Sequence, residues 1–203
     1  MFVVLTFLLM TLFVVMSPGI DTALITKRTI RNGSKDGFQV ALGITVGSGI
    51  HTLAATLGLS ALLMQSALAF GILKWIGALY LIYLGVKSLL AKPAAPATTT
   101  SLSTKHAFLE GFLSNVLNPK VIVFFLTFLP QFITSTAHAT RDFLAMGATY
   151  AVLSLCWFFF YVICLHYIRE WLLSPRVQLW MERLTGVVLI GFGIKLLFTK
   201  STV

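Results

Sequence analysis

Long stretches without a charged side chain constrain this chain more than any other feature of its sequence. The longest extends from Gly37 to Leu73 and covers 37 residues without Asp, Glu, Lys or Arg. One helix of that length would measure about 55 Å, whereas the hydrocarbon core of a bilayer is about 30 Å thick. The stretch therefore predicts two membrane-spanning helices that reverse direction near Gln65 and Ser66.

The composition favours an all-α integral membrane protein surrounded by lipid. Of the 203 residues, 58% are hydrophobic and 10% are charged, whereas soluble domains carry about 25% charged residues. The formal net charge is +9, but the basic residues lie in short segments between apolar runs, as the positive-inside rule requires. Because no polar fold is available to carry a basic face, we do not expect nucleic-acid binding.

Six apolar runs are long enough to cross a membrane, since a spanning helix needs about 20 apolar residues. They cover approximately residues 2–26, 38–62, 68–90, 108–133, 143–167 and 181–199. Ten of the 15 lysines and arginines follow or flank the first, third and fifth runs. The positive-inside rule therefore places these three segments in the cytoplasm and both termini outside.

The chain divides into two similar halves. Residues 93–105 form a linker rich in Pro, Ala, Thr and Ser, with residues 1–92 before it and 106–200 after it. Segments 81–92 and 189–200 are identical at six of twelve positions. Each half holds three spans, and an odd number inverts the second copy across the membrane. We therefore predict a single transmembrane transporter domain over the whole chain, built from two inverted three-helix repeats.

One helix break in each half contributes to the candidate site. Proline removes a backbone donor, so in a membrane the carbonyl group it leaves unpaired must find another donor or line a cavity. Carbonyls and acids suit an ammonium group, and amide donors and cations suit a carboxylate, so two such breaks suit a zwitterion. Two ordinary proline kinks are the simpler alternative. The candidate substrate-binding or proton-binding residues are Pro18, Gly19, Asp21, Asn118, Pro119 and Lys120.

Asp21 and Lys120 are the charged members of this set. Each costs about 2.5–3.5 kcal/mol at the centre of a spanning helix, which favours a functional role. Asp21 is expected to bind an ammonium group or carry a proton, and Lys120 to pair with Asp21 or hold a carboxylate. The alternatives are that Asp21 ends a helix at the interface, six positions before Lys27, and that the Lys120 side chain extends to an interface.

Three further residues stand out in the second span. Gly43 and Gly47 form a GxxxG pair, which predicts close packing against a broken helix or against a second copy in a homodimer. His51 is a candidate polar relay for protons, although one interhelical hydrogen bond is the commoner role of such a histidine. The sequence has no GxSxG, HExxH or phosphate loop and no cluster of metal ligands, so we expect no enzyme, metal or cofactor site.

Four motifs together resemble the LysE/RhtB family of bacterial amino-acid exporters over essentially the full length. They are Ser17-Pro18-Gly19-Ile20-Asp21, Lys74-Trp75-Ile76-Gly77-Ala78 running into Tyr80-Leu81-Ile82-Tyr83-Leu84-Gly85, Asn118-Pro119-Lys120, and Leu129-Pro130-Gln131-Phe132. The family pattern at the first motif is Pro-Gly-Pro-Asp, so Ile20 replaces a second proline and leaves one break where the family has two.

The resemblance implies a multi-pass protein of the bacterial inner membrane that exports amino acids or close derivatives by proton antiport. Within the family, the chain most resembles the members that export neutral substrates such as homoserine, threonine or leucine. A small-ion or metal exporter on the same scaffold is one alternative, and a membrane scaffold that transports nothing is another.

Overall fold

The computed structural model describes residues 2–59, 67–90, 106–133, 136–172 and 174–198. Within these ranges the regular elements are all helices and no strand occurs, which confirms the predicted all-α class. The predicted linker at 93–105 and the predicted reversal at Gln65 and Ser66 lie outside the described residues.

The helices follow the predicted order, with breaks inside the first and fourth runs. The first half contains α1 (Phe2–Met16), α2 (Ile20–Asn32), α3 (Ser34–Ala54), the π-helical turn η1 that continues it (Ala55–Leu59), and α5 (Ala67–Leu89). The second half contains α6 (Ala107–Val116), α7 (Pro119–Val123), η3 (Phe124–Phe128), η4 (Leu129–Phe132), η5 (Thr136–His138), α8 (Ala139–Leu172) and α9 (Pro175–Phe198).

The described residues hold three to five candidate membrane spans. Three helices are long and apolar enough alone, within Ser34–Leu59, Gly71–Leu89 and Ala139–Leu165. Two bent pairs pass the same test when each is taken as one span: α1 with α2, bent by 50°, and α6 with α7 and its continuation, bent by 46°. The two bends lie at Pro18 and Pro119, where the sequence predicts them. Helix α9 is not among the candidates, so a sixth span stays a prediction.

Two predicted helix boundaries differ most from the structure. The sequence predicts that the first span ends near residue 26, but α2 continues to Asn32, so the basic segment from Lys27 to Arg31 is helical. Gly33 then turns the chain with a φ of 90°, which glycine adopts without strain. The last helix is predicted to begin near residue 181 but begins at Pro175, because the first helical position does not need the N–H that proline lacks.

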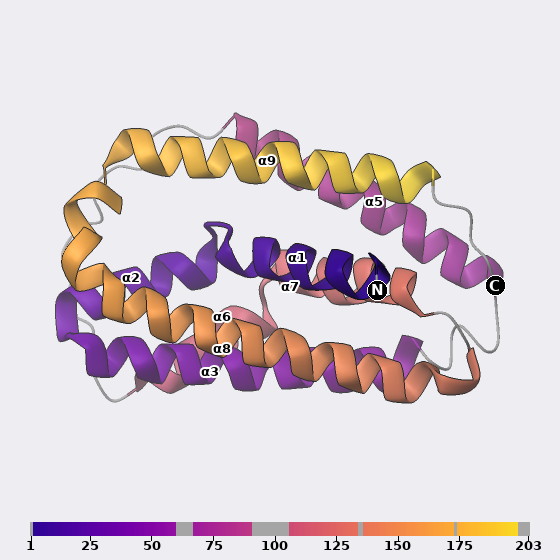
Figure 1. The fold of residues 1–203 in the computed structure, drawn as a ribbon, viewed down its shortest axis with the longest axis horizontal. Helices are drawn as coiled ribbons and strands as arrows, with labels where there is room; N and C mark the ends of the chain where they lie inside the picture. The colour runs from indigo at the N-terminus through magenta and orange to yellow at the C-terminus, as the bar shows by residue number, and fades with distance from the viewer. Residues whose placement is uncertain (1, 60–66, 91–105, 134–135, 173, 199–203) are drawn as a thin grey trace.

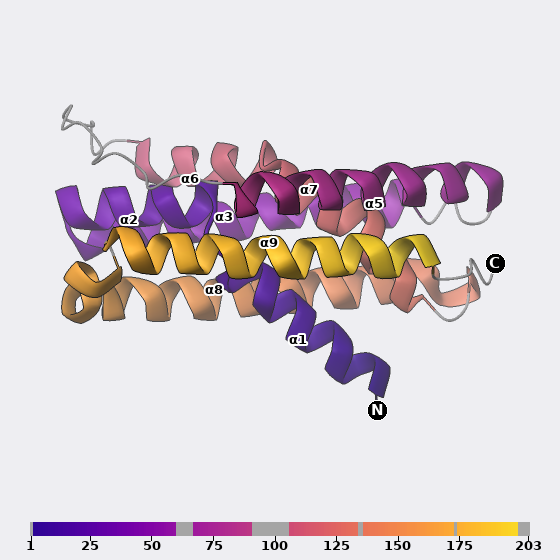
Figure 2. The same ribbon diagram turned by 90° about the horizontal axis from the view of Figure 1, so that it is seen from above.

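The helices form two groups (Figure 1). Helices α5 and α9 lie side by side along one edge, whereas α2, α3, α6 and α8 pack together with α1 and α7 beside them. Figure 2 shows the same pairing of α5 with α9 from above, and it shows α1 leaving the bundle at an angle toward the N-terminus. Large apolar side chains on α1 are accordingly exposed, including Val4, Leu5 and Leu9. In a membrane protein such side chains meet lipid.

Small residues set the contacts within each group. A Cβ added to Gly43 would lie 2.0 Å from the Phe108 carbonyl oxygen, and one added to Gly111 would lie 2.2 Å from that of Val40, so α3 and α6 pack backbone to backbone. Gly47 faces α6 as well, where an added Cβ would lie 2.9 Å from a side-chain oxygen of that helix. The GxxxG pair therefore lies in a contact within the chain.

The α5–α9 contact is antiparallel and also relies on small residues. A Cβ on Gly85 would lie 2.7 Å from the Gly186 carbonyl oxygen, and a Cβ on Gly193 would lie 2.8 Å from that of Ala78. In the alignment of segments 81–92 and 189–200, Gly85 corresponds to Gly193, and by the same offset Ala78 corresponds to Gly186. The two halves thus bring corresponding small residues to the same contact.

Candidate functional site

The first break leaves one carbonyl group without its helical partner. Helix α1 makes its last regular bond from the Ser17 amide to the Phe13 carbonyl, at 2.9 Å. The next residue is Pro18, which has no N–H to donate to the Val14 carbonyl. The Ser17 hydroxyl donates to that carbonyl instead, at 2.8 Å. The break therefore exposes acceptors that require donors from elsewhere in the fold.

Lys120, on the other broken helix, supplies these donors. Its Nζ donates to the Val14 carbonyl at 3.1 Å, to the Ser17 carbonyl at 3.0 Å and to the Ser17 hydroxyl at 2.9 Å. An ammonium group has three N–H donors, so all are used. Gly19 leaves room for this approach, because a Cβ there would lie 3.2 Å from Nζ. Lys120 thus closes the end of α1.

The second break is satisfied in the same manner. The Asn118 side chain caps α7 by accepting a bond from the Lys120 amide at 3.0 Å. Pro119 leaves the Asn115 carbonyl without its helical donor. That carbonyl accepts from the Asn118 amide at 3.0 Å and from His51 Nε2 at 3.0 Å. Because a carbonyl oxygen only accepts, His51 Nε2 carries the proton in this contact.

Asp21 joins the two broken helices to each other. It lies in the first turn of α2, where the helix dipole favours an acid. Its carboxylate accepts from the Ser114 hydroxyl at 2.6 Å, from Asn115 Nδ2 at 3.0 Å and from Asn118 Nδ2 at 3.1 Å. The hydroxyl and both side-chain amides act as donors, which suits an ionised carboxylate because such a group only accepts hydrogen bonds. Asp21 is 6% exposed and forms no ion pair with Lys120 or any other residue that the structure describes.

Sequence reasoning identified Asp21 and Asn118 but missed Ser114 and Asn115. A signal was present, because these two polar residues lie four and three positions before Asn118, about one helical turn away. The sequence could not indicate that this face meets the first turn of α2. The contact depends on tertiary packing, in which α6 also lies against α3 at Gly43 and Gly47.

An open pocket of about 620 Å³ lies beside the first break. Pro18, Gly19 and Lys120 line the side of the pocket at the broken helices, which we call its inner end. The rest of its lining comes from the α5 region, namely Tyr83, Leu84, Val86, Lys87, Ser88 and Leu90, and from α9, namely Glu182, Thr185 and Leu189. The pocket therefore lies where the α5–α9 pair faces the broken helices.

The predicted site residues separate into two places. Pro18, Gly19 and Lys120 line the pocket, whereas Asp21 and the second break are absent from its lining. Asp21 and Asn118 lie in the polar joint, the name used for the hydrogen bonds from Ser114, Asn115 and Asn118 to the Asp21 carboxylate. His51 contacts this joint from α3, and the centroid of its ring lies 5.5 Å from the centroid of the Phe125 ring. Among the described residues no group of three His, Cys, Asp or Glu could hold a metal ion.

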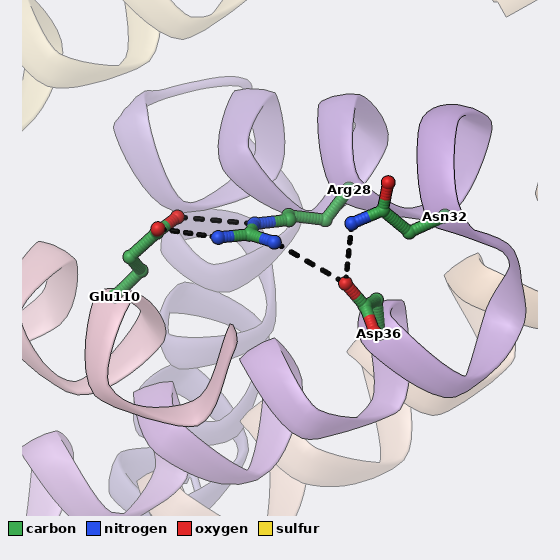
Figure 3. A network of polar contacts seen from close by, with 4 residues as sticks. All are labelled: Arg28, Asn32, Asp36 and Glu110. Carbon is green, nitrogen blue, oxygen red and sulfur yellow. Dashed lines mark hydrogen bonds and ion pairs between the residues drawn. The ribbon is translucent and has the colours of Figure 1, made fainter. Parts of the chain in front are cut away.

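A buried charge cluster lies farther along α2 (Figure 3). Arg28 donates through Nε to Glu110 at 3.0 Å, through a second nitrogen to the other Glu110 oxygen, and to Asp36 at 3.2 Å. Asn32 donates to the same Asp36 oxygen at 2.6 Å. Arg28 belongs to the basic segment that follows the first predicted span, but it is fully buried and links α2, α3 and α6.

Known proteins resemble this chain over nearly its whole length. A family model of LysE type translocators matches residues 12–200. The uncharacterized membrane protein YrhP of Bacillus subtilis strain 168 is 36% identical over 192 residues, which cover 89% of this chain and 91% of the relative. An uncharacterized membrane protein of Vibrio cholerae serotype O1 is 32% identical over 97% of both chains.

A third relative has a name that states a function. The leucine efflux protein of Salmonella typhimurium strain LT2 is 28% identical over 97% of this chain and 95% of its own. No solved structure matches the chain. The family match covers both helix breaks, the pocket and the charge cluster, and the apolar helices agree with a multi-pass membrane protein. The chain therefore belongs to the LysE type translocator family.

Proposed function

We propose that this protein is a secondary transporter that exports neutral amino acids, with an apolar one such as leucine as the first candidate, by proton antiport across the bacterial inner membrane. The observation that carries the proposal is the open pocket beside a broken helix, with a cation at its inner end. The family membership and the Salmonella leucine efflux proteins support the substrate class.

The paired breaks support an inverted repeat. At each break the carbonyl group that proline leaves unpaired receives a side-chain donor from another helix, Lys120 at Val14 and His51 at Asn115. The α5–α9 pair brings corresponding glycines to one antiparallel contact. Broken helices at corresponding positions of two repeats are the usual frame of a substrate site in secondary transporters. On this basis α9 is the sixth span.

The pocket is proposed as the substrate site. Lys120 places a positive charge at its inner end, which attracts a carboxylate, and Leu84, Val86 and Leu189 give it an apolar wall suited to an apolar side chain. Its volume of about 620 Å³ falls within the range of about 300–1,000 Å³ typical of small-molecule sites. Its outer residues lie near the end of α5 and the start of α9, beside segments that the positive-inside rule assigns to the cytoplasm.

Asp21 is proposed as the proton-coupled group, although it does not line the pocket. Its carboxylate holds Ser114, Asn115 and Asn118 on the other broken helix. A proton on Asp21 would remove an acceptor from these donors and loosen the joint between the two breaks. Such a change at the joint would couple proton binding to movement of the broken helices against the α5–α9 pair.

The test is flux in proteoliposomes that contain the purified protein. Labelled amino acids are screened at two proton gradients, and we expect leucine or another apolar neutral amino acid to move fastest, at a rate that rises with the gradient. The Asp142→Asn variant is the control, because Asp142 lies outside the joint and pairs only with its exposed neighbour Arg141 among the described residues. Absence of flux for every amino acid under both gradients would refute the proposal.

A further inference from the structure

The outer wall of the pocket carries two opposite charges that remain unpaired. Lys87, on α5, and Glu182, on α9, both line the pocket. Neither forms an ion pair with the other, and neither hydrogen-bonds to any residue that the structure describes. The other acids with described side chains all have partners: Asp21 in the joint, Asp36 and Glu110 at the charge cluster, and Asp142 beside its neighbour.

We propose that Lys87 and Glu182 form a recognition site for a zwitterion at the mouth of the pocket, with Glu182 holding the ammonium group and Lys87 the carboxylate. The inference rests on the proposed function and adds a second site to it, distinct from Lys120 at the inner end. Helices α5 and α9 are antiparallel neighbours, so the two side chains come from adjoining walls. Glu182 is partly withdrawn from water without a partner, which is costly for a charge, and the ammonium group of a bound zwitterion would give it one.

Glu182 is better suited to the ammonium group than Asp21, the acid that the sequence favours. The Asp21 carboxylate already accepts three hydrogen bonds and lies outside the pocket. The Lys120 ammonium is likewise occupied by three acceptors at the end of α1. A substrate therefore has to displace existing bonds at the inner end, whereas the charges at the mouth are available on arrival.

The apolar residues near the two charges indicate the substrate class. Val86 and Leu90 lie beside Lys87 on the α5 side, and Leu189 lies on the α9 side two turns beyond Glu182. The site thus combines one anion, one cation and an aliphatic surface. This arrangement fits an amino acid with an apolar side chain and disfavours one with a charged side chain, whose third charge would have no partner there.

Competition by two half-substrates tests the assignment. In proteoliposomes that transport leucine, 3-methylbutylamine retains the ammonium group of leucine without its carboxylate, and 4-methylpentanoate retains the carboxylate without the ammonium group. We expect Glu182→Gln to weaken inhibition by the amine about tenfold and to leave inhibition by the acid unchanged. We expect Lys87→Gln to have the opposite effect. Both variants should raise the KM for leucine more than they lower the maximal rate.

Several outcomes separate this inference from the proposed function. Failure of the unmodified protein to move any amino acid would refute the proposed function, whereas leucine transport with unchanged inhibition patterns in both variants would refute the recognition site alone. A purely structural role would weaken both inhibitors equally. Glu182→Asp keeps the charge and should restore most of the amine sensitivity. If Glu182→Gln does not insert into the membrane, Lys87→Gln provides the test, because Lys87 is exposed. That variant must then weaken inhibition by 4-methylpentanoate, and unchanged inhibition would refute the recognition site.

Discussion

Removal of Glu110 should expose the energetic role of the buried charge cluster. The Arg28 guanidinium is 0% exposed and takes both Glu110 oxygens and one Asp36 oxygen as acceptors. The variant Glu110→Ala removes the acid that accepts two of these hydrogen bonds and leaves the guanidinium buried beside Asp36. A buried ion pair contributes little net stability when intact, but loss of one partner leaves an uncompensated charge that is costly.

The expected loss is about 3 kcal/mol in the free energy of unfolding, at the lower end of the range of about 3–5 kcal/mol for breaking a buried pair. The lower end applies because Asp36 remains and because the Glu110 side chain is 37% exposed, which admits water. Replacement of all three charged groups, as in Arg28→Met with Asp36→Asn and Glu110→Leu, leaves no charge of the cluster buried. We therefore expect the triple variant to be more stable than Glu110→Ala.

The assay is unfolding in detergent micelles, followed by tryptophan fluorescence and by loss of helical circular dichroism. Asp142→Ala is the matched control, because it removes an acid from an ion pair whose arginine is 75% exposed, and it should cost less than about 1 kcal/mol. If Glu110→Ala costs no more than this control, or if the triple variant is destabilised by the sum of its single changes, the reasoning about an uncompensated charge is wrong.

Three further changes test other parts of the structure. Asp21→Asn should lower leucine flux at least tenfold while the protein still inserts, because the joint loses its charged acceptor; unchanged flux at equal membrane content would remove Asp21 from the mechanism. Gly43→Val should prevent stable packing of α3 on α6, whereas Gly49→Ala, where the added Cβ meets nothing within 4 Å, should be tolerated; thermal unfolding compares them. Lys120→Met should cost about 1–3 kcal/mol of unfolding free energy because the Ser17 carbonyl loses its donor, and denaturant titration would contradict this if stability were unchanged.

Much of the helical framework could be predicted because it depends on local properties. Long uncharged runs demand helices in a bilayer, and proline interrupts a helix wherever it stands, so both breaks were predictable from Pro18 and Pro119 alone. The glycine turn at Gly33 was predictable for the same reason. The helix ends were less predictable, since charged residues such as Lys27 and Arg31 remain compatible with a helix once neighbouring helices cover part of it.

The candidate site was only partly predictable, because it depends on how each helix is rotated about its axis. The sequence by itself determined that Asp21 and Lys120 are unusual charges beside two breaks. Only the tertiary structure decided that Asp21 faces α6 and that Lys120 closes the end of α1 at the pocket. It likewise decided that Arg28 is buried between two acids and that Glu182 faces the pocket. The physical reason is that a run of apolar residues specifies a helix, whereas close packing between helices specifies which side chains meet.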